Sequence, residues 1–192
     1  MYSKKEYNKP HPVPENSYGK TYGEHRDFLE FDLNTHKKLQ KICQKNGIKY
    51  SCSVWDINSA KEIISLRPEI LKIPSAHNND FPLLDLICKL HKGQIHISTG
   101  MTKKNEVEQL IKYLKKKNKL KKTVLYYCVS SYPTEDKELC LFEIKEFKKK
   151  YAKELLAIGF SGHHKGIAID MAALTLGAQY FERHFTLDRT YK

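Results

Sequence analysis

The stretch QIHISTGMTKKNEVEQLIKYLKKK, residues 94–117, joins a strand pattern to a helix pattern. Residues 94–99 form a short run rich in apolar and β-branched side chains, which is typical of a strand. From Val107 onward, apolar residues recur at spacings of three and four, which predicts an amphipathic helix over residues 103–117. This stretch therefore predicts one strand–helix unit.

The same kind of unit recurs along the chain. Strand patterns lie at residues 48–55, 70–75, 94–99, 124–130, 157–161 and 178–185. Helix patterns lie at residues 35–45, 57–66, 81–91, 103–117, 137–153 and 166–176. Regular alternation of strands and helices implies a parallel sheet with helical crossovers. Such a sheet is either an open, doubly wound sheet or part of a (β/α)8 barrel.

Polar residues at the ends of the predicted strands favour the barrel. No GxGxxG or GxxxxGK[ST] pattern follows a strand, which argues against a nucleotide-binding open sheet. Polar side chains close the predicted strands at Ser53, Ser75, Ser98, Ser130, Ser161 and Arg183. Barrels build their active sites at this end of the strands, although serine also caps the helix that follows. We therefore predict an α/β fold, an incomplete (β/α)8 TIM barrel with about six strand–helix units.

Domain organisation and charge give further limits. Proline and glycine interrupt any period over residues 1–30, which predicts an irregular arm before a partial barrel over residues 31–192. Much of the +12 net charge lies in lysine clusters at 115–122 and 148–150. These clusters hold no interleaved aromatic residues, so solvated surface is favoured over a nucleic-acid-binding face.

Neither a membrane span nor a secretion signal is expected. No apolar run reaches the roughly 18 residues of a membrane span. The amino-terminal segment has no apolar core of a signal peptide. These observations predict a cytoplasmic protein with no membrane partner.

His163 and His184 are the sharpest candidates for a metal site, because each closes a predicted strand. Neighbouring strands lie about 4.8 Å apart, so two imidazoles at adjacent strand ends can share an ion. Two histidines with water or carboxylate ligands suit Mn²⁺, Zn²⁺ or Fe²⁺. The alternative is a pair of hydrogen-bonded structural histidines. His164 is a second candidate ligand, although alternation would turn its side chain elsewhere.

Lys72 is the corresponding candidate for an anion site, because it lies inside the apolar stretch 70–75. A lysine there either faces solvent on an edge strand or meets an anion, since burying it unpaired is costly. Together with Ser75, Ser98 and Ser161 it would form a phosphate or carboxylate pocket. Tyr132 belongs either to a plain turn or to a loop that presents its phenol to a substrate.

Several motifs occur together and in a fixed order. They are NSYGKTYGEHR at 16–26, KIPSA at 72–76, NDFPLL at 79–84, ISTGM at 97–101, YCVSSYPT at 127–134, GFSGH at 159–163 and ERHFTLDR at 182–189. This set resembles the sialic acid synthases, the N-acetylneuraminate synthase family. The resemblance implies a TIM barrel that condenses phosphoenolpyruvate with N-acetylmannosamine or a related aldose. The products would be a nonulosonic (sialic-type) acid and phosphate.

The resemblance also implies roles for single residues. Phosphoenolpyruvate would be held by Lys72, Ser53, Ser75, Ser98 and Ser161. Ser130 stands where the family frequently has asparagine, and it joins this substrate-binding set.

The remaining implied roles concern the sugar, the metal and proton transfer. Tyr132 would contact the sugar, and His163 and His184 would hold Mn²⁺ or Mg²⁺. His77 stands where the family commonly has an acidic residue, so we expect it to act as the catalytic acid or base. Gly162 replaces the aspartate of the family's Ser-Asp-His motif.

Other parts of the family pattern are missing. The first two barrel strands, with a Lys-x-Gln segment, and the C-terminal antifreeze-like domain have no counterpart. We therefore expect the barrel portion from strands 3 to 8 of a synthase, acting as a homodimer or with a complementing second polypeptide. The alternatives are a degenerate, non-catalytic protein that binds a sugar acid or a partner and, less favoured, a basic nucleic-acid-binding module.

Overall fold

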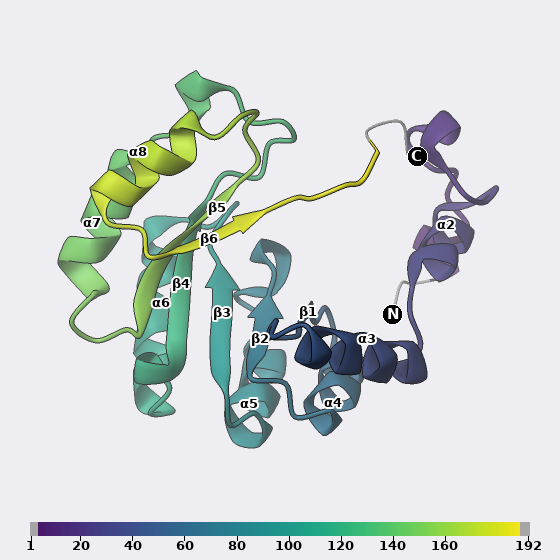
Figure 1. The fold of residues 1–192 in the computed structure, drawn as a ribbon, viewed down its shortest axis with the longest axis horizontal. Coiled ribbons are helices and arrows are strands. Elements are labelled where there is room, and N and C mark those ends of the chain that lie inside the picture. The colour runs from purple at the N-terminus through teal and green to yellow at the C-terminus, as the bar shows by residue number, and fades with distance from the viewer. Residues whose placement is uncertain (1–3, 189–192) are drawn as a thin grey trace. The chain divides into compact units, whose positions relative to one another are not determined.

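The computed structural model describes residues 4–188, which contain one six-stranded parallel sheet in sequential strand order. The strands are β1 Ser51–Ser53, β2 Ile70–Ile73, β3 Gln94–Ser98, β4 Thr123–Cys128, β5 Ala157–Gly162 and β6 Tyr180–Arg183. Each crossover moves the chain one strand along, as in a barrel, whereas a doubly wound sheet reverses direction. The sheet curls into part of a barrel (Figure 1), which confirms the predicted fold class.

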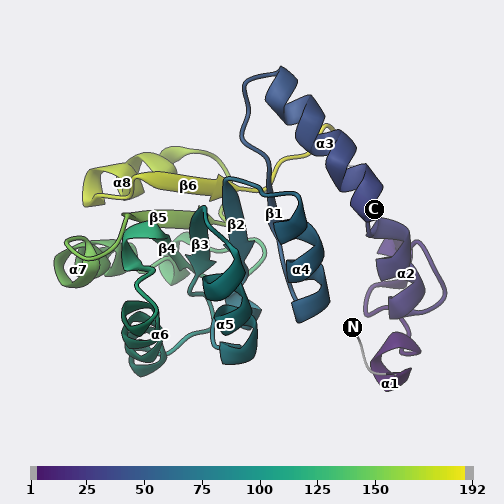
Figure 2. The same cartoon turned by 90° about the horizontal axis from the view of Figure 1, so that it is seen from below.

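A helix follows each of the first five strands. These helices are α4 Ile57–Ser65, α5 Phe81–Leu90, α6 Lys104–Lys116, α7 Phe142–Tyr151 and α8 Ala168–Leu176. Figure 2 shows α4, α5 and α6 side by side along one face of the sheet. The apolar stripe of α6 from Val107 to Leu114 is buried, as its periodicity predicts.

The two faces of the sheet differ because side chains alternate along a strand. Ile95 and Ile97 of β3 are fully buried in the main hydrophobic core with the helices. His96 and Ser98 face the other side of the sheet, where Ser98 meets Lys72 of β2. Candidate functional side chains are therefore on the inner face of the curled sheet, and the apolar core lies behind them.

The chain divides into two compact units, one of residues 1–42 with 185–192 and one of residues 43–184. The boundary falls inside the helix α3 Leu33–Lys45, not near residue 30. The predicted irregular arm also contains regular structure: α1 Lys4–Tyr7, a 3-10 turn at Pro14–Asn16 and α2 Tyr22–Leu29. Thr21 and Glu24 form a capping box that begins α2.

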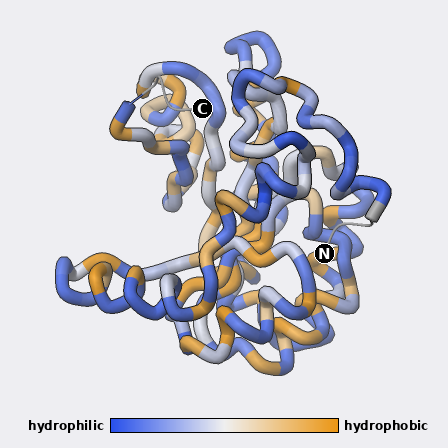
Figure 3. Tube along the Cα trace, turned by 90° about the vertical axis from the view of Figure 1, so that its right-hand side faces the viewer, coloured by the Kyte–Doolittle hydropathy of each residue, from blue (hydrophilic) through white to orange (hydrophobic). Residues whose placement is uncertain are grey.

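Some elements are shorter than their sequence patterns. β1 has three residues within the pattern 48–55, and α7 begins at Phe142 after a separate 3-10 turn at Asp136–Glu138. Short 3-10 turns also follow β2 at Ser75–His77 and precede β4 at Leu120–Lys122. Figure 3 shows hydrophobic and hydrophilic residues interleaved along the trace. Within residues 4–188, no helix combines the length and apolar character needed to cross a bilayer.

Candidate active site

Lys72 lies at the centre of a polar cluster on the inner face of the sheet. Its side chain is only 9% exposed, and its Nζ donates a hydrogen bond to Ser98 Oγ at 2.7 Å. The same ammonium lies 3.3 Å from Glu182 Oε1 on β6. β2 is flanked by β1 and β3, so the alternative of a solvent-facing lysine on an edge strand is wrong.

Glu182 connects this lysine to the next predicted residue, and sequence reasoning did not single it out. Ser161 Oγ donates to Glu182 Oε1 at 2.9 Å, so a single carboxylate oxygen accepts from both groups. The register of β5 with β6 pairs Ser161 with Glu182. Its position two residues before His184 is the sequence signal for it, because alternate residues of a strand share a face.

The charge states of the cluster follow from burial. Burial lowers the pKa of Lys72, and the nearby Glu182 carboxylate opposes that shift. Burial also lowers the pKa of His96 to about 4, with the Lys72 charge acting in the same direction. His96 Nε2 donates to Gln94 Oε1 at 3.1 Å, so its Nδ1 accepts from the Tyr126 hydroxyl at 2.8 Å. His96, which pairs in register with Lys72 on the neighbouring strand, is therefore neutral and has both ring nitrogens hydrogen-bonded.

Ser75 and Ser130 meet at Gly100, beside the Lys72 cluster. Gly100 N donates to Ser75 Oγ at 2.9 Å. A Cβ at Gly100 would lie 2.2 Å from Ser130 Oγ and 2.9 Å from Ser75 Oγ, so only glycine allows both hydroxyls to approach this backbone. Ser53 pairs in register with Lys72 and therefore shares its face of the sheet.

His163 and His184 come together with Tyr132 at the ends of β5 and β6. The two imidazole centroids lie 5.3 Å apart, and the Tyr132 ring lies 4.0 Å from that of His163. His163 Nδ1 donates to the Val129 carbonyl at 2.6 Å, which leaves Nε2 as the free acceptor. Burial lowers the pKa of His163, which favours the neutral form that binds metals.

The two imidazoles border a cavity. This cavity of about 270 Å³ is lined by Tyr132, Pro133, Gly162, His163, His164, Arg183 and His184. Within residues 4–188, no group of three or more histidine, cysteine or acidic side chains is arranged to hold an ion. The two histidines would therefore supply two ligands, and water or substrate oxygens the rest.

The other candidate ligand, His164, is occupied differently. Its side chain has no exposed surface, and its ring stacks on Phe160 with centroids 5.7 Å apart. The Arg183 guanidinium, which is always a donor, contacts His164 Nε2. Nε2 is therefore not free for a metal, which favours His163 as the ligand.

His77 lies beside the cluster on the 3-10 turn after β2. Its Nδ1 is 3.7 Å from Asp80 Oδ2, and its ring meets Trp55 edge-on at 5.4 Å. These contacts place a partly exposed imidazole among the segments that follow β1 and β2. Its catalytic role stays a prediction.

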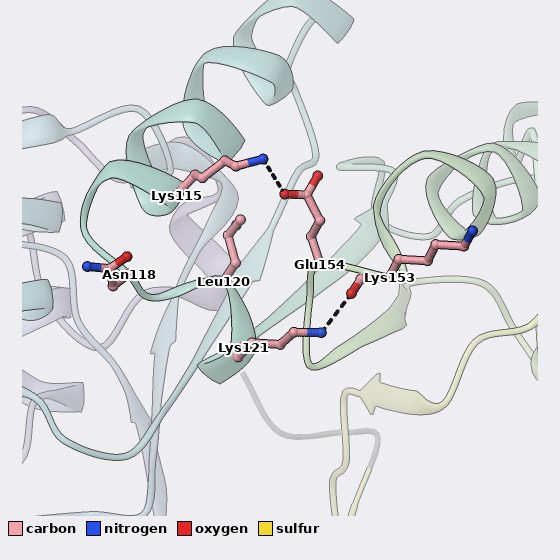
Figure 4. Close-up of a pocket in the computed structure, with 6 residues that line it drawn as sticks. All are labelled: Lys115, Asn118, Leu120, Lys121, Lys153 and Glu154. Carbon is pink, nitrogen blue, oxygen red and sulfur yellow. Dashed lines mark hydrogen bonds and ion pairs between the residues drawn. The ribbon is translucent and has the colours of Figure 1, made fainter.

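Several of the clustered lysines lie at the amino-terminal ends of the strands, where they donate hydrogen bonds to backbone carbonyls. Some of them line a cavity of about 340 Å³. There Lys115 pairs with Glu154 and Lys121 donates to the Lys153 carbonyl, each at 2.6 Å; Figure 4 marks both contacts. Lys119 and Lys122 donate to the carbonyls of His91 and Lys92. The expectation of a plain solvated surface is therefore incomplete, because these lysines join the segments that precede β3, β4 and β5.

Known proteins are similar to this chain in sequence and in fold. An N-acetylneuraminate-9-phosphate synthase of Drosophila melanogaster is 37% identical over 94% of this chain and 47% of its own length. An N,N'-diacetyllegionaminic acid synthase of Campylobacter jejuni is 35% identical over 84% of this chain and 47% of its own length. The N-acetylneuraminic acid synthetase of Leptospira borgpetersenii, solved in complex with citrate, superposes with a TM-score of 0.81. It is 30% identical, and the match covers 90% of this chain and 59% of that one.

The match to the family is continuous along the chain. The NeuB family model matches residues 1–192. The chain spans about half the length of the curated relatives that it matches. Together with the barrel-type strand order, these matches show that the chain belongs to the NeuB family.

Proposed function

We propose that this chain carries part of the active site of a synthase that condenses phosphoenolpyruvate with N-acetylmannosamine or a related aldose. The products are a nonulosonic acid and phosphate. Membership of the NeuB family supports condensation chemistry of this class. The observation that carries the proposal is the buried Lys72 ammonium with Ser98 and Ser161, next to the cavity of His163, His184 and Tyr132. One site thus joins an anion-binding cluster to a metal- and sugar-binding cavity.

The anion-binding cluster would hold and orient phosphoenolpyruvate. Lys72 supplies the cation, and Ser53, Ser75, Ser98, Ser130 and Ser161 supply hydroxyl donors around it. Carbon 3 of phosphoenolpyruvate attacks the aldehyde carbon of the open-chain sugar, water adds at carbon 2, and the bond from carbon 2 to the phosphate oxygen then breaks. Lys72 stabilises the negative charge on the carboxylate and on the departing phosphate.

The cavity at the ends of β5 and β6 would hold the sugar and a divalent metal. His163 and His184 would bind Mn²⁺ or Mg²⁺, which supplies Lewis-acid polarisation of the aldehyde oxygen. Tyr132 would contact the sugar from the loop after β4, with its hydroxyl as donor or acceptor. His77 would exchange a proton with substrate at its imidazole nitrogen.

The rest of the active site would come from segments that correspond to the other half of the curated relatives. We place the enzyme in the cytoplasm, where phosphoenolpyruvate is made, and we expect either a homodimer or a complementing second polypeptide.

The test is phosphoenolpyruvate binding to the full chain by calorimetry. Lys72→Met is expected to weaken binding about tenfold or more, because a hydrogen bond to a charged group contributes roughly 1.5–3 kcal/mol. Lys112→Met, on the exposed side of α6, is the matched control and should leave binding unchanged. Equal binding by the Lys72→Met variant and wild type would refute the assignment. Binding of N-acetylneuraminate without any phosphoenolpyruvate binding would favour the non-catalytic alternative.

A further inference from the structure

The anion-binding cluster already contains an anion of its own. Glu182 Oε1 accepts the hydrogen bond from Ser161 at 2.9 Å and lies 3.3 Å from Lys72 Nζ. These are the two groups that a phosphate or carboxylate oxygen of a ligand would need. The Glu182 carboxylate therefore occupies the place of a ligand oxygen.

The exposure of the two side chains decides whether Lys72 or Glu182 can move out of the ion pair. The Lys72 side chain is 9% exposed and is anchored to Ser98, whereas the Glu182 side chain is 43% exposed. A carboxylate with an open path to water regains its hydration when it turns away, while a buried ammonium does not. Any rearrangement on ligand binding therefore moves Glu182 and leaves Lys72 in place.

We propose that Glu182 is an internal counter-anion, which neutralises Lys72 and accepts the hydrogen bond of Ser161 in the free protein and is displaced when a ligand anion binds. This inference rests on the proposed function only in taking Lys72 as the anion-binding cation. It goes further by assigning to Glu182 the control of ligand affinity. The free site is kept neutral, and weakly held anions are excluded because they do not displace the carboxylate.

A counter-anion role and a supporting role for Glu182 predict opposite changes in anion affinity when its charge is removed. Glu182→Gln keeps the length of the side chain and an acceptor oxygen for Ser161, but it removes the charge that competes with the ligand. Affinity for an anion should therefore rise, by about tenfold or more for two charges a few ångströms apart in a partly buried site. A residue that merely supports Lys72 or Ser161 would instead lower the affinity when changed.

The experiment is calorimetric titration of inorganic phosphate into the full chain and its variants. Glu182→Gln is expected to bind about tenfold more tightly than wild type. Glu154→Gln is the matched control, because it removes the carboxylate that pairs with Lys115 at the opposite ends of the strands. It should bind phosphate as wild type does. If Glu182→Gln does not fold by circular dichroism, Glu182→Asp serves instead. Its shorter side chain is not expected to reach both partners, so it too should bind phosphate more tightly.

Two results separate failure of this inference from failure of the proposed function. If Lys72→Met abolishes phosphate binding while Glu182→Gln binds no more tightly than wild type, the counter-anion role is wrong and the anion site stands. If Lys72→Met binds as wild type does, or if neither wild type nor Glu182→Gln binds, the anion site itself is wrong and the inference falls with it. Binding by Glu182→Gln where wild type binds too weakly to measure supports the inference.

Discussion

His96 shows how the inner face of the sheet sets the charge of a single side chain. It is 5% exposed, pairs in register with Lys72, and lies between the hydroxyl of Tyr126 and the amide of Gln94. A second cation at this depth would add to the ammonium of Lys72 without a counter-charge. The neutral imidazole avoids the cost of a second buried cation and still forms hydrogen bonds with Tyr126 and Gln94. The cluster therefore keeps Lys72 as its one buried cation.

The lowered pKa of His96 predicts a pH dependence of stability. Its pKa falls from 6.5 to about 4 on folding, so the unfolded chain binds more protons than the folded chain between these values. Stability should therefore be lost as the pH falls from about 6.5 toward 4, by at most about 3 kcal/mol for this group. His96→Gln keeps hydrogen-bonding capacity and should remove this part of the slope.

The measurement is the free energy of unfolding in urea at several pH values between 4 and 7. The difference between wild type and His96→Gln isolates His96 from the other histidines. If the two curves run parallel over this range, His96 is not the group that titrates, and its assigned charge state is wrong.

At the scale of elements, Arg183 joins the end of β6 to the loop between β5 and α8. Its Nη2 donates to the carbonyls of His164 at 2.7 Å and Gly166 at 3.1 Å, and its Nη1 donates to Asp170 in the first turn of α8. The loop begins at His163, whose ring is held separately by Val129. One guanidinium thus fixes the backbone that follows a proposed metal ligand.

Replacing this guanidinium should loosen the β5–α8 connection. Arg183→Met is expected to lower the free energy of unfolding by about 2 kcal/mol, because a carboxylate and two carbonyls lose a charged donor. Lys104→Met, which breaks an exposed pair with Glu143, is the control and should cost about 0–1 kcal/mol. Urea denaturation gives both values, and amide hydrogen exchange should quicken at residues 163–168 in the Arg183 variant alone. Equal losses in the two variants would contradict this role.

Which elements the sequence predicts depends on whether their signal is local. The apolar stripe of α6 is local, and both its helix and its buried face were predicted correctly. α2 was missed because prolines and glycines interrupt residues 1–30, although the Thr21–Glu24 capping box was a readable start signal. β1 is shorter than its pattern because an apolar run does not show where strand pairing stops.

The candidate site follows the same division. Lys72 was predicted from its place inside an apolar strand, and Ser98 and Ser161 from their places at strand ends. The structure brings the three together. Glu182 was not predicted, because its contact with Lys72 depends on the four strand pairings that lead from β2 to β6. Such pairings join residues far apart in the sequence, and no local period reports them.

At the scale of the whole molecule, the described sheet is open at both edges. Within residues 4–188, β1 pairs with β2 alone and β6 with β5 alone, so each carries one unpaired edge. Unpaired edges of parallel strands are templates for further strands. Relatives in this family are about twice as long as the matched region, and we expect further strand–helix units to pair with both edges.

Supplying those units should therefore create an active site. We expect the chain to associate with the segments of the Drosophila relative that lie outside the matched region. The product should be a complex with a higher melting temperature, because new strand pairs and buried apolar faces stabilise the folded state. With Mn²⁺, phosphoenolpyruvate and N-acetylmannosamine or its 6-phosphate, the complex should release phosphate. The Lys72→Met chain should form the same complex without release. A stable complex of the wild-type chain that releases no phosphate would instead establish the chain as a non-catalytic member of its family.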